Sequence, residues 1–163
     1  MSFKVQCLKK LVYDPITGLF TWISNGTHGV KKGDIAGCKN KAGYIILSIS
    51  GKKMLAHRVA WLFSTGEFPI GNLDHINRNK SDNRIINLRE ATYAQNAQNR
   101  AKNICNTSGY KGVTWHKRDK KWQAAITVNK KCIHLGYFSS AKEAHEAYIK
   151  NSVKYQTHSI FNN

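Results

Sequence analysis

Acidic residues are scarce in this sequence: nine Asp and Glu stand against 26 Lys and Arg, and the formal net charge is +17. The excess is not confined to a tail, because it amounts to +5 over residues 1–50, +4 over residues 51–101 and +8 over residues 102–163. A surface this positive repels itself unless it meets a polyanion. Lys and Arg contacts to phosphate dominate the affinity of proteins for nucleic acid, so nucleic acid is the partner that we expect.

Long apolar runs and basic amphipathic stretches are missing, which argues against a membrane surface as the polyanion. Proline is also scarce, with two residues in 163, and no long low-complexity segment is present. We therefore expect a folded chain of one large or two small domains. Hydrophobic residues make up 41% of the chain, which is enough for a core of modest size.

Paired cysteines are absent: Cys7, Cys38, Cys105 and Cys132 are far apart and form no Cys-x-x-Cys motif. Structural zinc sites usually use such pairs, so no structural zinc is expected, and Cys105 with His116 lacks metal-ligand spacing too. The first ten residues lack the apolar centre of a secretion signal. We expect the chain to stay in a reducing cytoplasm, with four free and mostly buried thiols.

The first half of the chain is predicted to be mainly β structure, followed by a helix. The turn signal DPITG leads into a strand at residues 18–22. Ile45, Leu47 and Ile49 recur at every second position, and Ser50-Gly51 suits a tight hairpin to a second strand. Apolar residues at helical spacing predict a short helix over residues 57–65, which GEFPIGN ends.

Residues 73–100, LDHINRNKSDNRIINLREATYAQNAQNR, collect an unusual number of Asn and Arg. The pair Asp74-His75 follows an apolar residue at a predicted strand end. The run RIINLR is compatible with a short strand or a turn. Thr92 and Gln95 form a capping box, which predicts a helix that begins near Thr92 and carries Asn96, Asn99 and Arg100 on one face.

These side chains suit the metal-assisted hydrolysis of a phosphodiester. Asp74 and Asn96 offer the hard oxygen ligands that Mg²⁺ prefers, and a divalent cation can neutralise the scissile phosphate. His75 is well matched to taking a proton from an attacking water near neutral pH. Asn87 can tie the turn to the backbone near His75 and so fix its imidazole. An isolated Asp-His pair would more often be structural, but here it comes with both asparagines.

The same residues resemble the HNH nucleases, and in particular the phage HNH homing endonucleases with their ββα-metal motif. Asn87 lies thirteen residues after Asp74, and Asn96 nine after Asn87. The preceding segments YDPITGLFTW, KAGY and AHRVAW follow one another as in that group. Some HNH nucleases carry a further His one turn later, where this chain has Arg100, which cannot ligate. The resemblance therefore implies one divalent cation, Mg²⁺ with Mn²⁺ as a substitute, with Asp74 and Asn96 as its two protein ligands and water and DNA oxygens as the others.

The last third of the chain is predicted to form three strands and a helix. Trp122, Ala124, Ile126 and Val128 alternate between two charged turns. Ser140 and Glu143 form a capping box, and the apolar face that should pack on the sheet consists of Ala141, Ala144, Tyr148 and Tyr155. This order resembles an AP2/ERF-type DNA-binding domain, in which the sheet lies in the major groove.

Several side chains are predicted to contact DNA, although each basic one is equally compatible with a solvated surface charge. Those around the Asp-His pair are Arg78, Lys80, Arg84, Arg89 and Arg100. The resemblance to the AP2/ERF-type domain adds, by their positions on the C-terminal sheet, Trp115, Lys117, Arg118, Lys121, Gln123 and Lys130. Trp122 belongs either to that surface or to the core. His57 either touches the scissile phosphate or supports the site by packing, and we favour support. Asn99 is a weaker alternative to Asn96.

Together the resemblances imply an α+β protein with N-terminal β-hairpins that lead into a ββα-metal core. The expected domains are a nuclease domain (residues 1–101), a linker (102–109) and an AP2-like domain (110–163). The expected function is a metal-dependent endonuclease on double-stranded DNA, a site-preferring nickase or homing enzyme in the bacterial host cell of a phage. A monomer would nick one strand, and a dimer would be needed to cut both. The rivals are a transcription regulator with a degenerate nuclease part and a ribosomal-type basic protein.

Overall fold

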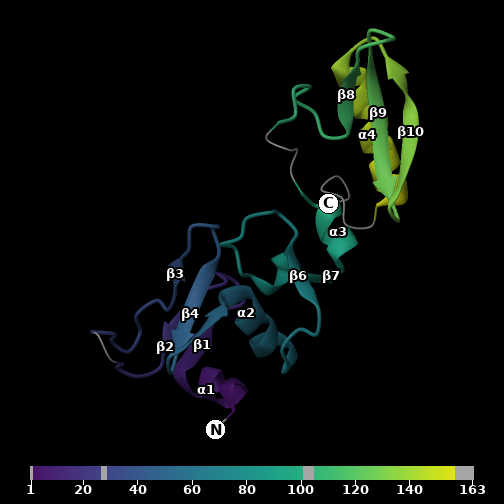
Figure 1. The fold of residues 1–163 in the computed structure, drawn as a ribbon. Helices are drawn as coiled ribbons and strands as arrows, with labels where there is room; N and C mark the ends of the chain where they lie inside the picture. The colour runs from purple at the N-terminus through teal and green to yellow at the C-terminus, as the bar shows by residue number, and fades with distance from the viewer. Residues whose placement is uncertain (1, 27–28, 101–104, 157–163) are drawn as a thin grey trace. The chain divides into compact units, whose positions relative to one another are not determined.

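The computed structural model describes residues 2–26, 29–100 and 105–156, which fall into two compact units (Figure 1). The first unit is Met1–Ala91 and the second is Thr92–Asn163. The predicted domains 1–101 and 110–163, with their linker 102–109, were defined by expected function and stay a prediction. Residues 102–104 of that linker lie outside the described residues.

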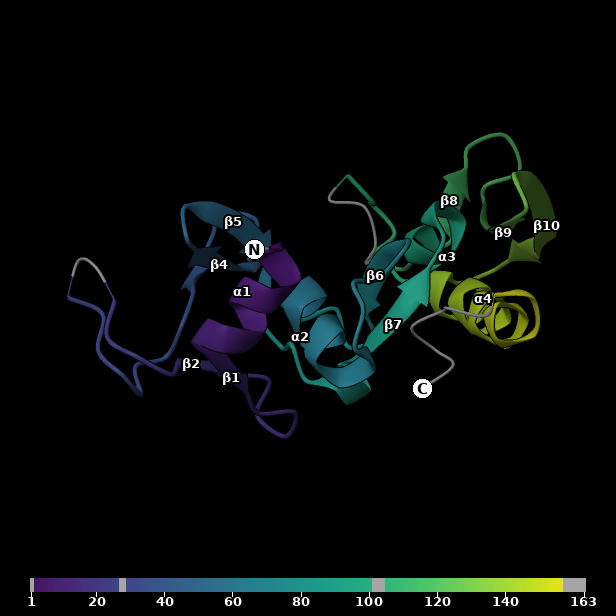
Figure 2. The same ribbon diagram turned by 90° about the horizontal axis from the view of Figure 1, so that it is seen from below.

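The first unit begins with a helix that the sequence reasoning missed, α1 (Phe3–Lys10). Its N-cap Ser2 accepts a hydrogen bond from the backbone N–H of Val5, and Cys7 is buried on its inner face. The helix is short and its apolar pattern is weak, so packing against α2 (Ala56–Thr65) rather than local propensity stabilises it. Seen from below, the two helices lie side by side (Figure 2).

Two small antiparallel sheets complete the core of this unit. β1 (Leu11–Tyr13) pairs with β2 (Phe20–Trp22), and β4 (Ile45–Ile49) lies between β3 (Cys38–Lys39) and β5 (Lys52–Leu55). The predicted hairpin is confirmed, and Ser50 and Gly51 have φ of 50° and 79°, the left-handed values that its tight turn requires.

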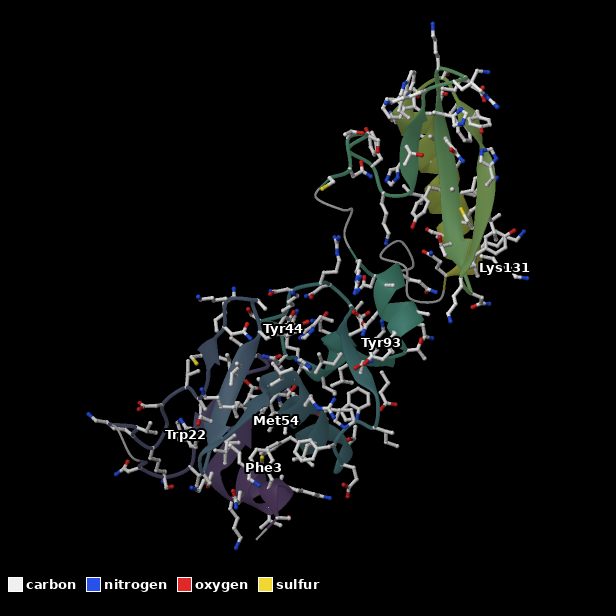
Figure 3. The ribbon with its side chains drawn as sticks, in the orientation of Figure 1. Phe3, Trp22, Tyr44, Met54, Tyr93 and Lys131 are labelled. Carbon is white, nitrogen blue, oxygen red and sulfur yellow. The ribbon has the colours of Figure 1, made fainter. Side chains whose placement is uncertain are left out.

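The predicted helix over residues 57–65 is also confirmed as α2, which ends at Gly66 with φ 84°. The core contains Leu11, Phe20, Leu47, Val59 and Leu62. Phe3, Trp22 and Met54 pack around it (Figure 3).

A third antiparallel pair carries the Asp-His motif. β6 (Asn72–His75) pairs with β7 (Leu88–Ala91), and a 3-10 turn, η1 (Ile85–Asn87), precedes β7. The two interpretations of RIINLR are therefore both partly right: the run starts as a turn and ends as a strand. Asp74 and His75 stand at the end of β6, as predicted.

The second unit opens with α3 (Tyr93–Gln98), whose capping box of Thr92 and Gln95 is confirmed. The helix is shorter than predicted. Asn99 is already its C-cap and Arg100 lies beyond it, so neither residue belongs to the helical face that carries Asn96. That α3 completes a ββα-metal core with β6 and β7 stays a prediction.

The remainder of the second unit is a three-stranded antiparallel sheet with one helix. β9 (Lys121–Val128) is central between β8 (Val113–His116) and β10 (Lys131–Phe138), and α4 (Ala141–Tyr155) contacts all three strands (Figure 1). The three predicted strands, the helix and its capping box of Ser140 and Glu143 are confirmed.

One predicted position on the inner face of α4 is wrong. Ala144 and Tyr148 are buried, but Tyr155 is exposed, and Ser152 takes the inner position four residues after Tyr148. Helical spacing alone places Tyr155 close to the direction of Tyr148, but Tyr155 is the last residue of α4. Ser152 is tolerated at the inner position because its hydroxyl donates to the carbonyl oxygen of Ile149 at 2.8 Å.

The expectation of mostly buried thiols is also wrong, since Cys7 is buried but Cys38, Cys105 and Cys132 are exposed. Cys38 belongs to the edge strand β3, and Cys132 belongs to the edge strand β10, where side chains of alternate residues face solvent. Within the described ranges, none of the helices combines the length and apolar character needed to span a bilayer.

Candidate functional site

Asp74 and His75 are both buried at the end of β6, with 8% and 5% of their surface exposed. Arg89 stands directly opposite Asp74 in the β6–β7 pair, and its Nε and Nη2 donate to Asp74 Oδ2 at 3.1 and 3.0 Å. Charge-assisted bonds of this kind are strong and directional. Arg89 therefore orients the Asp74 carboxylate, a role that the sequence reasoning missed. Its predicted contact with DNA stays a prediction.

The imidazole of His75 lies among two other rings. The centroid of the His57 ring is 4.9 Å away at an interplanar angle of 86°, and that of Tyr44 is 5.9 Å away. Burial lowers the pKa of His75, while the Asn83 side chain and the Asp74 carboxylate oppose that shift. His75 is thus held neutral near pH 7, which is the state that a general base requires.

His57 is a second buried histidine at the site, with 6% of its surface exposed. Burial, together with the nearby His75 and Arg58, lowers the pKa of His57 to about 3. His57 therefore stays uncharged beside His75 over the physiological pH range. Neither its contact with His75 nor that of Tyr44 could be deduced from the motifs AHR and KAGY, which are remote from Asp74 in the sequence.

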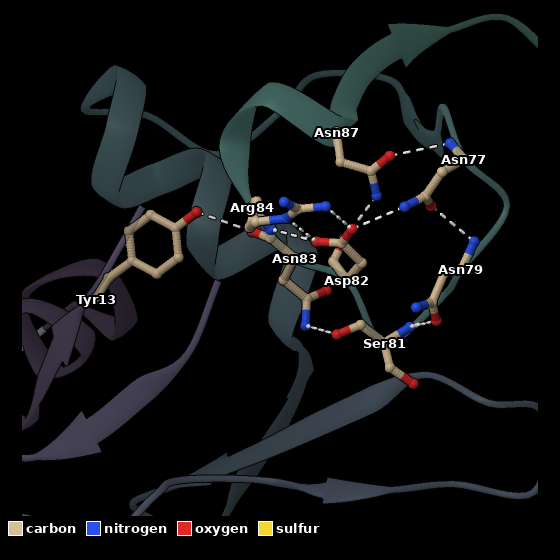
Figure 4. Close-up of polar contacts among 8 residues, drawn as sticks. All are labelled: Tyr13, Asn77, Asn79, Ser81, Asp82, Asn83, Arg84 and Asn87. Carbon is tan, nitrogen blue, oxygen red and sulfur yellow. Dashed lines mark hydrogen bonds and ion pairs between the residues drawn. The ribbon is translucent and has the colours of Figure 1, made fainter. Parts of the chain in front are cut away.

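Asn87 ties together the loop that follows His75 (Figure 4). Its Oδ1 accepts from the backbone N–H of Asn77 at 2.9 Å, and its Nδ2 donates to the carbonyl oxygen of Asp82 at 2.8 Å. Its own carbonyl oxygen accepts from the N–H of Ile76 at 2.9 Å. These are bonds to backbone near His75, as the sequence reasoning expected, and they do not involve the imidazole itself. That they fix the ring for catalysis stays a prediction.

The other asparagines of this loop hold its shape (Figure 4). Asn77 Oδ1 accepts from the N–H of Asn79 at 2.8 Å, and Asn79 Oδ1 accepts from the N–H of Ser81 at 3.1 Å. Asn77 Nδ2 donates to Asp82 Oδ2 at 2.7 Å. Side-chain turns of this kind replace backbone pairing where the chain cannot form a strand. The asparagine richness of the stretch is thus largely structural.

Two predicted DNA-contacting side chains of the loop are engaged within the protein. Arg84 donates from Nε and Nη2 to Asp82 at 2.8 and 2.6 Å, and this pairing lowers the pKa of Asp82 to about 2. Lys80 Nζ donates to the carbonyl oxygen of Ala42 at 3.0 Å and lies 4.8 Å from the centroid of the Tyr44 ring. Lys80 thereby joins the loop after His75 to the loop before β4.

Arg78 differs from these residues. It has φ of 63°, is exposed, and its side chain makes no hydrogen bond or ion pair with any residue that the structure describes. Among the predicted phosphate contacts of the first unit, it is the guanidinium with the fewest restraints within the protein.

Asn96 lies in the second unit, half-buried on α3, and Asn99 is the buried C-cap of the same helix. A carboxylate and an amide oxygen are the hard donors that a divalent cation such as Mg²⁺ accepts, together with water. The buried, oriented carboxylate of Asp74 fits such an ion. Across residues 2–26, 29–100 and 105–156, no cluster of three or more His, Cys, Asp or Glu side chains could hold a metal. A cation at Asp74 would therefore draw on amide, water or phosphate oxygens.

On the C-terminal sheet, the register decides which predicted DNA contacts share a face. Val113 pairs with Ala124 and Trp115 with Trp122, so both tryptophans lie on the face that α4 covers. Their rings meet edge-on at 5.0 Å, and Trp122 packs against the core of this unit. The core alternative for Trp122 is thus the correct one, whereas Trp115 remains 44% exposed.

The remaining candidates lie on the opposite face or in the turns of this sheet. Lys121 and Gln123 alternate with the buried positions and face away from α4. Lys117 and Arg118 are exposed in the β8–β9 turn, where Arg118 pairs with Asp119. Lys130 is exposed in the β9–β10 turn with φ of 64°.

Comparison with known proteins locates a likeness on the same stretch. Residues 54–98 match the family described as HNH endonuclease, and this span contains Asp74, His75, Asn87 and Asn96. Protein 3.8 of Escherichia phage T7 is 34% identical over 76 residues, which are 46% of this chain and 63% of that protein, so the match spans less than two thirds of the relative. No solved structure matches the chain. The buried Asp-His pair, its partners and its loop thus lie in the part of the chain that is similar to HNH endonucleases, and the chain has a phage relative.

Proposed function

We propose that this protein is a metal-dependent endonuclease that hydrolyses a phosphodiester bond in double-stranded DNA. One observation carries the proposal: a neutral, buried His75 lies beside an Asp74 carboxylate that Arg89 orients, within the span that matches HNH endonucleases. A buried pair of this kind, with each partner held by its own contacts, is costly to build for stability alone.

Each side chain has one task in the proposed reaction. His75 takes the proton from the attacking water at its imidazole nitrogen, and its lowered pKa keeps that nitrogen unprotonated. Asp74 and Asn96 hold a divalent cation, Mg²⁺ or Mn²⁺, which when bound neutralises the scissile phosphate and the leaving oxygen. Arg89 keeps Asp74 in place, and Asn87 keeps the chain after His75 in place.

DNA is held by charge spread over both units. Arg78, Lys80, Arg84 and Arg100 would contribute contacts to phosphates. The sheet face opposite α4 would contribute Lys121 and Gln123, with Lys117, Arg118 and Lys130 from the turns, in the manner of an AP2-like module. Trp115, which lies on the edge strand β8 and on the face that α4 covers, would also contact DNA. One chain carries one such site, so we propose a site-preferring nickase or homing enzyme that acts as a monomer in the bacterial host of a phage.

A cleavage assay on supercoiled plasmid and phage DNA tests the proposal, with Mg²⁺, Mn²⁺ or EDTA. We expect metal-dependent nicking that His75→Ala abolishes while DNA binding persists. His145→Ala is the matched control, because His145 is a partly buried histidine of the other unit. Cleavage that survives both EDTA and His75→Ala would overturn the mechanism. Tight binding without cleavage of any DNA in either metal would favour a regulator.

A further inference from the structure

We propose that His57 is a positioning residue that holds the imidazole of His75 in the orientation needed to accept a proton. This inference rests on the proposed function, because it gives a role within the same site. Only the span from Met54 to Gln98 carries the family likeness, and that likeness assigns no task to a second histidine.

The ring contact is the first observation. His57 is the second residue of α2 and His75 is the last of β6, so the contact joins two separate elements. Their centroids are 4.9 Å apart and their planes are nearly perpendicular, at 86°. Edge-to-face is a preferred arrangement for rings, because the positive edge of one meets the negative face of the other. A ring held in this way resists rotation about its χ2 bond.

Tyr44 adds a second restraint. Its ring centroid is 5.5 Å from that of His57 and 5.9 Å from that of His75, so the three rings contact one another pairwise. The position of Tyr44 is in turn set by Lys80, which lies over its ring, and by Asn40 Oδ1, which accepts from its backbone N–H at 2.9 Å. His75 is therefore restrained by side chains from α2 and from the loop before β4.

The start of α2 is tied to the approach to β6. Arg58, the neighbour of His57, donates from Nη1 to the carbonyl oxygen of Gly71 at 3.1 Å and from Nη2 to that of Pro69 at 2.9 Å. These residues immediately precede β6. The bonds fix how far the N-terminal turn of α2 stands from the strand that carries His75, so the separation of the two rings is specified by short contacts.

The chemistry of His57 is the last observation. Its Nδ1 is buried and has no hydrogen-bond partner among the residues that the structure describes. An unpaired buried nitrogen costs stability, and an apolar side chain of similar volume would avoid that cost. Core packing alone therefore does not explain an imidazole here. The need for a flat, uncharged ring that is small enough to stand edge-on to His75 does explain an imidazole at this position.

The first readout is catalysis. His57→Ala should lower the single-turnover nicking rate at saturating DNA by about 10- to 100-fold, because small displacements of a catalytic group cost rates of that order. The dissociation constant for DNA should change less than about twofold. His57→Phe keeps a ring and should stay within about threefold of wild type.

The matched control is Val59→Ala, which removes a buried side chain from the same helix but not from the ring cluster. It should lower thermal stability without lowering the nicking rate of the folded fraction. If His57→Ala and Val59→Ala lower the rate equally at equal stability, the positioning role is wrong.

The second readout does not depend on cleavage. The imidazole resonances of His75 should form one sharp set in wild type and in His57→Phe, and should broaden or double in His57→Ala. Unchanged His75 resonances in His57→Ala would overturn the inference. If wild type cuts no DNA, the proposed function fails, but the resonances still decide whether His57 orders His75.

Discussion

Arg89 donates two hydrogen bonds to a single oxygen of Asp74, directly across the β6–β7 pair. The side chains of Arg89 and Asp74 are 19% and 10% exposed, so the ion pair is largely removed from water. Removing the guanidinium would take from the buried Asp74 carboxylate its ion-pair partner Arg89. Arg89 thus supports the proposed cation ligand from within the protein, whatever DNA it also meets.

Arg89→Ala should therefore lower the free energy of unfolding by about 3 kcal/mol, as for other broken buried pairs. It should also reduce nicking at a fixed Mg²⁺ concentration, because Asp74 loses its orientation. Urea unfolding and plasmid nicking measure the two effects. Arg78→Ala is the control, since Arg78 is exposed, and it should weaken DNA binding without loss of stability. Equal stability of the two variants would contradict the structural role of Arg89.

Asn87→Ala should remove the side-chain hydrogen bonds that hold the loop after His75. Two bonds are lost, to the N–H of Asn77 and the carbonyl oxygen of Asp82, and Asn87 is 6% exposed, so we expect a loss of about 1–3 kcal/mol. The nicking rate should fall while the DNA dissociation constant stays nearly constant. Asn79→Ala provides the comparison, because Asn79 is exposed and its side chain holds one backbone N–H. A rate loss as large in Asn79→Ala would argue that any loosening of the loop suffices.

The stability of the protein should fall as the pH drops below about 6.5. The pKa of His57 is lowered to about 3 and that of His75 is lowered too, so the folded state binds fewer protons than the unfolded chain in this window. Each neutral histidine should cost about 1.4 kcal/mol per pH unit between its unfolded and folded pKa. Asp82, with a pKa of about 2, contributes only below its ordinary value near 3.8.

Urea unfolding at pH 7.5, 5.5 and 4.5 measures this slope. In His57→Phe, the slope of the free energy of unfolding against pH should fall by about 1.4 kcal/mol per pH unit, which is the contribution of one proton. An unchanged slope in His57→Phe would mean that His57 is not buried neutral in the folded protein. Nicking by wild type should be nearly independent of pH from 7 to 8, because His75 is already unprotonated there.

Gly112→Ala should destabilise the second unit. A Cβ at this position would lie 2.0 Å from Cδ2 of the buried Tyr148, and φ is 76°. Gly109 has a similar φ of 78° with no atom within 4 Å of the added Cβ. Both variants bear the left-handed strain of about 1–2 kcal/mol, and only Gly112→Ala bears the clash as well. Thermal melts of both variants provide the test, and equal melting temperatures would show that Tyr148 moves aside.

Lys121→Ala should weaken DNA binding and lower the salt dependence of the association constant by about 0.9 in a log–log plot, as for one lost phosphate contact. Lys142→Ala is the charge-matched control, because Lys142 is exposed on α4, which covers the other face of the sheet. Binding measured from low to moderate salt distinguishes them. If Lys142→Ala has the larger effect, DNA meets the helical side of the second unit.

Local signals in the sequence were enough to predict several elements. The capping boxes at Thr92 and Ser140 and the hairpin turn at Ser50-Gly51 depend on contacts within four residues, so their sequence patterns carry the full information. Helix α1 lacks such a signal beyond its Ser2 cap and exists because Cys7 packs into a core built from distant strands. The exposure of Tyr155 was likewise not predictable, because the apolar spacing does not tell where α4 ends relative to its sheet.

Some residues of the candidate site were likewise predictable from the sequence, and others were found only in the structure. The spacing of Asp74, His75, Asn87 and Asn96 was visible in the chain because a family motif preserves order and distance along the sequence. The sequence did not reveal which guanidinium orients Asp74 or which two rings contact His75. Arg89, His57 and Tyr44 come from β7, α2 and the loop before β4, and only the packing of these parts brings them within contact distance of the motif.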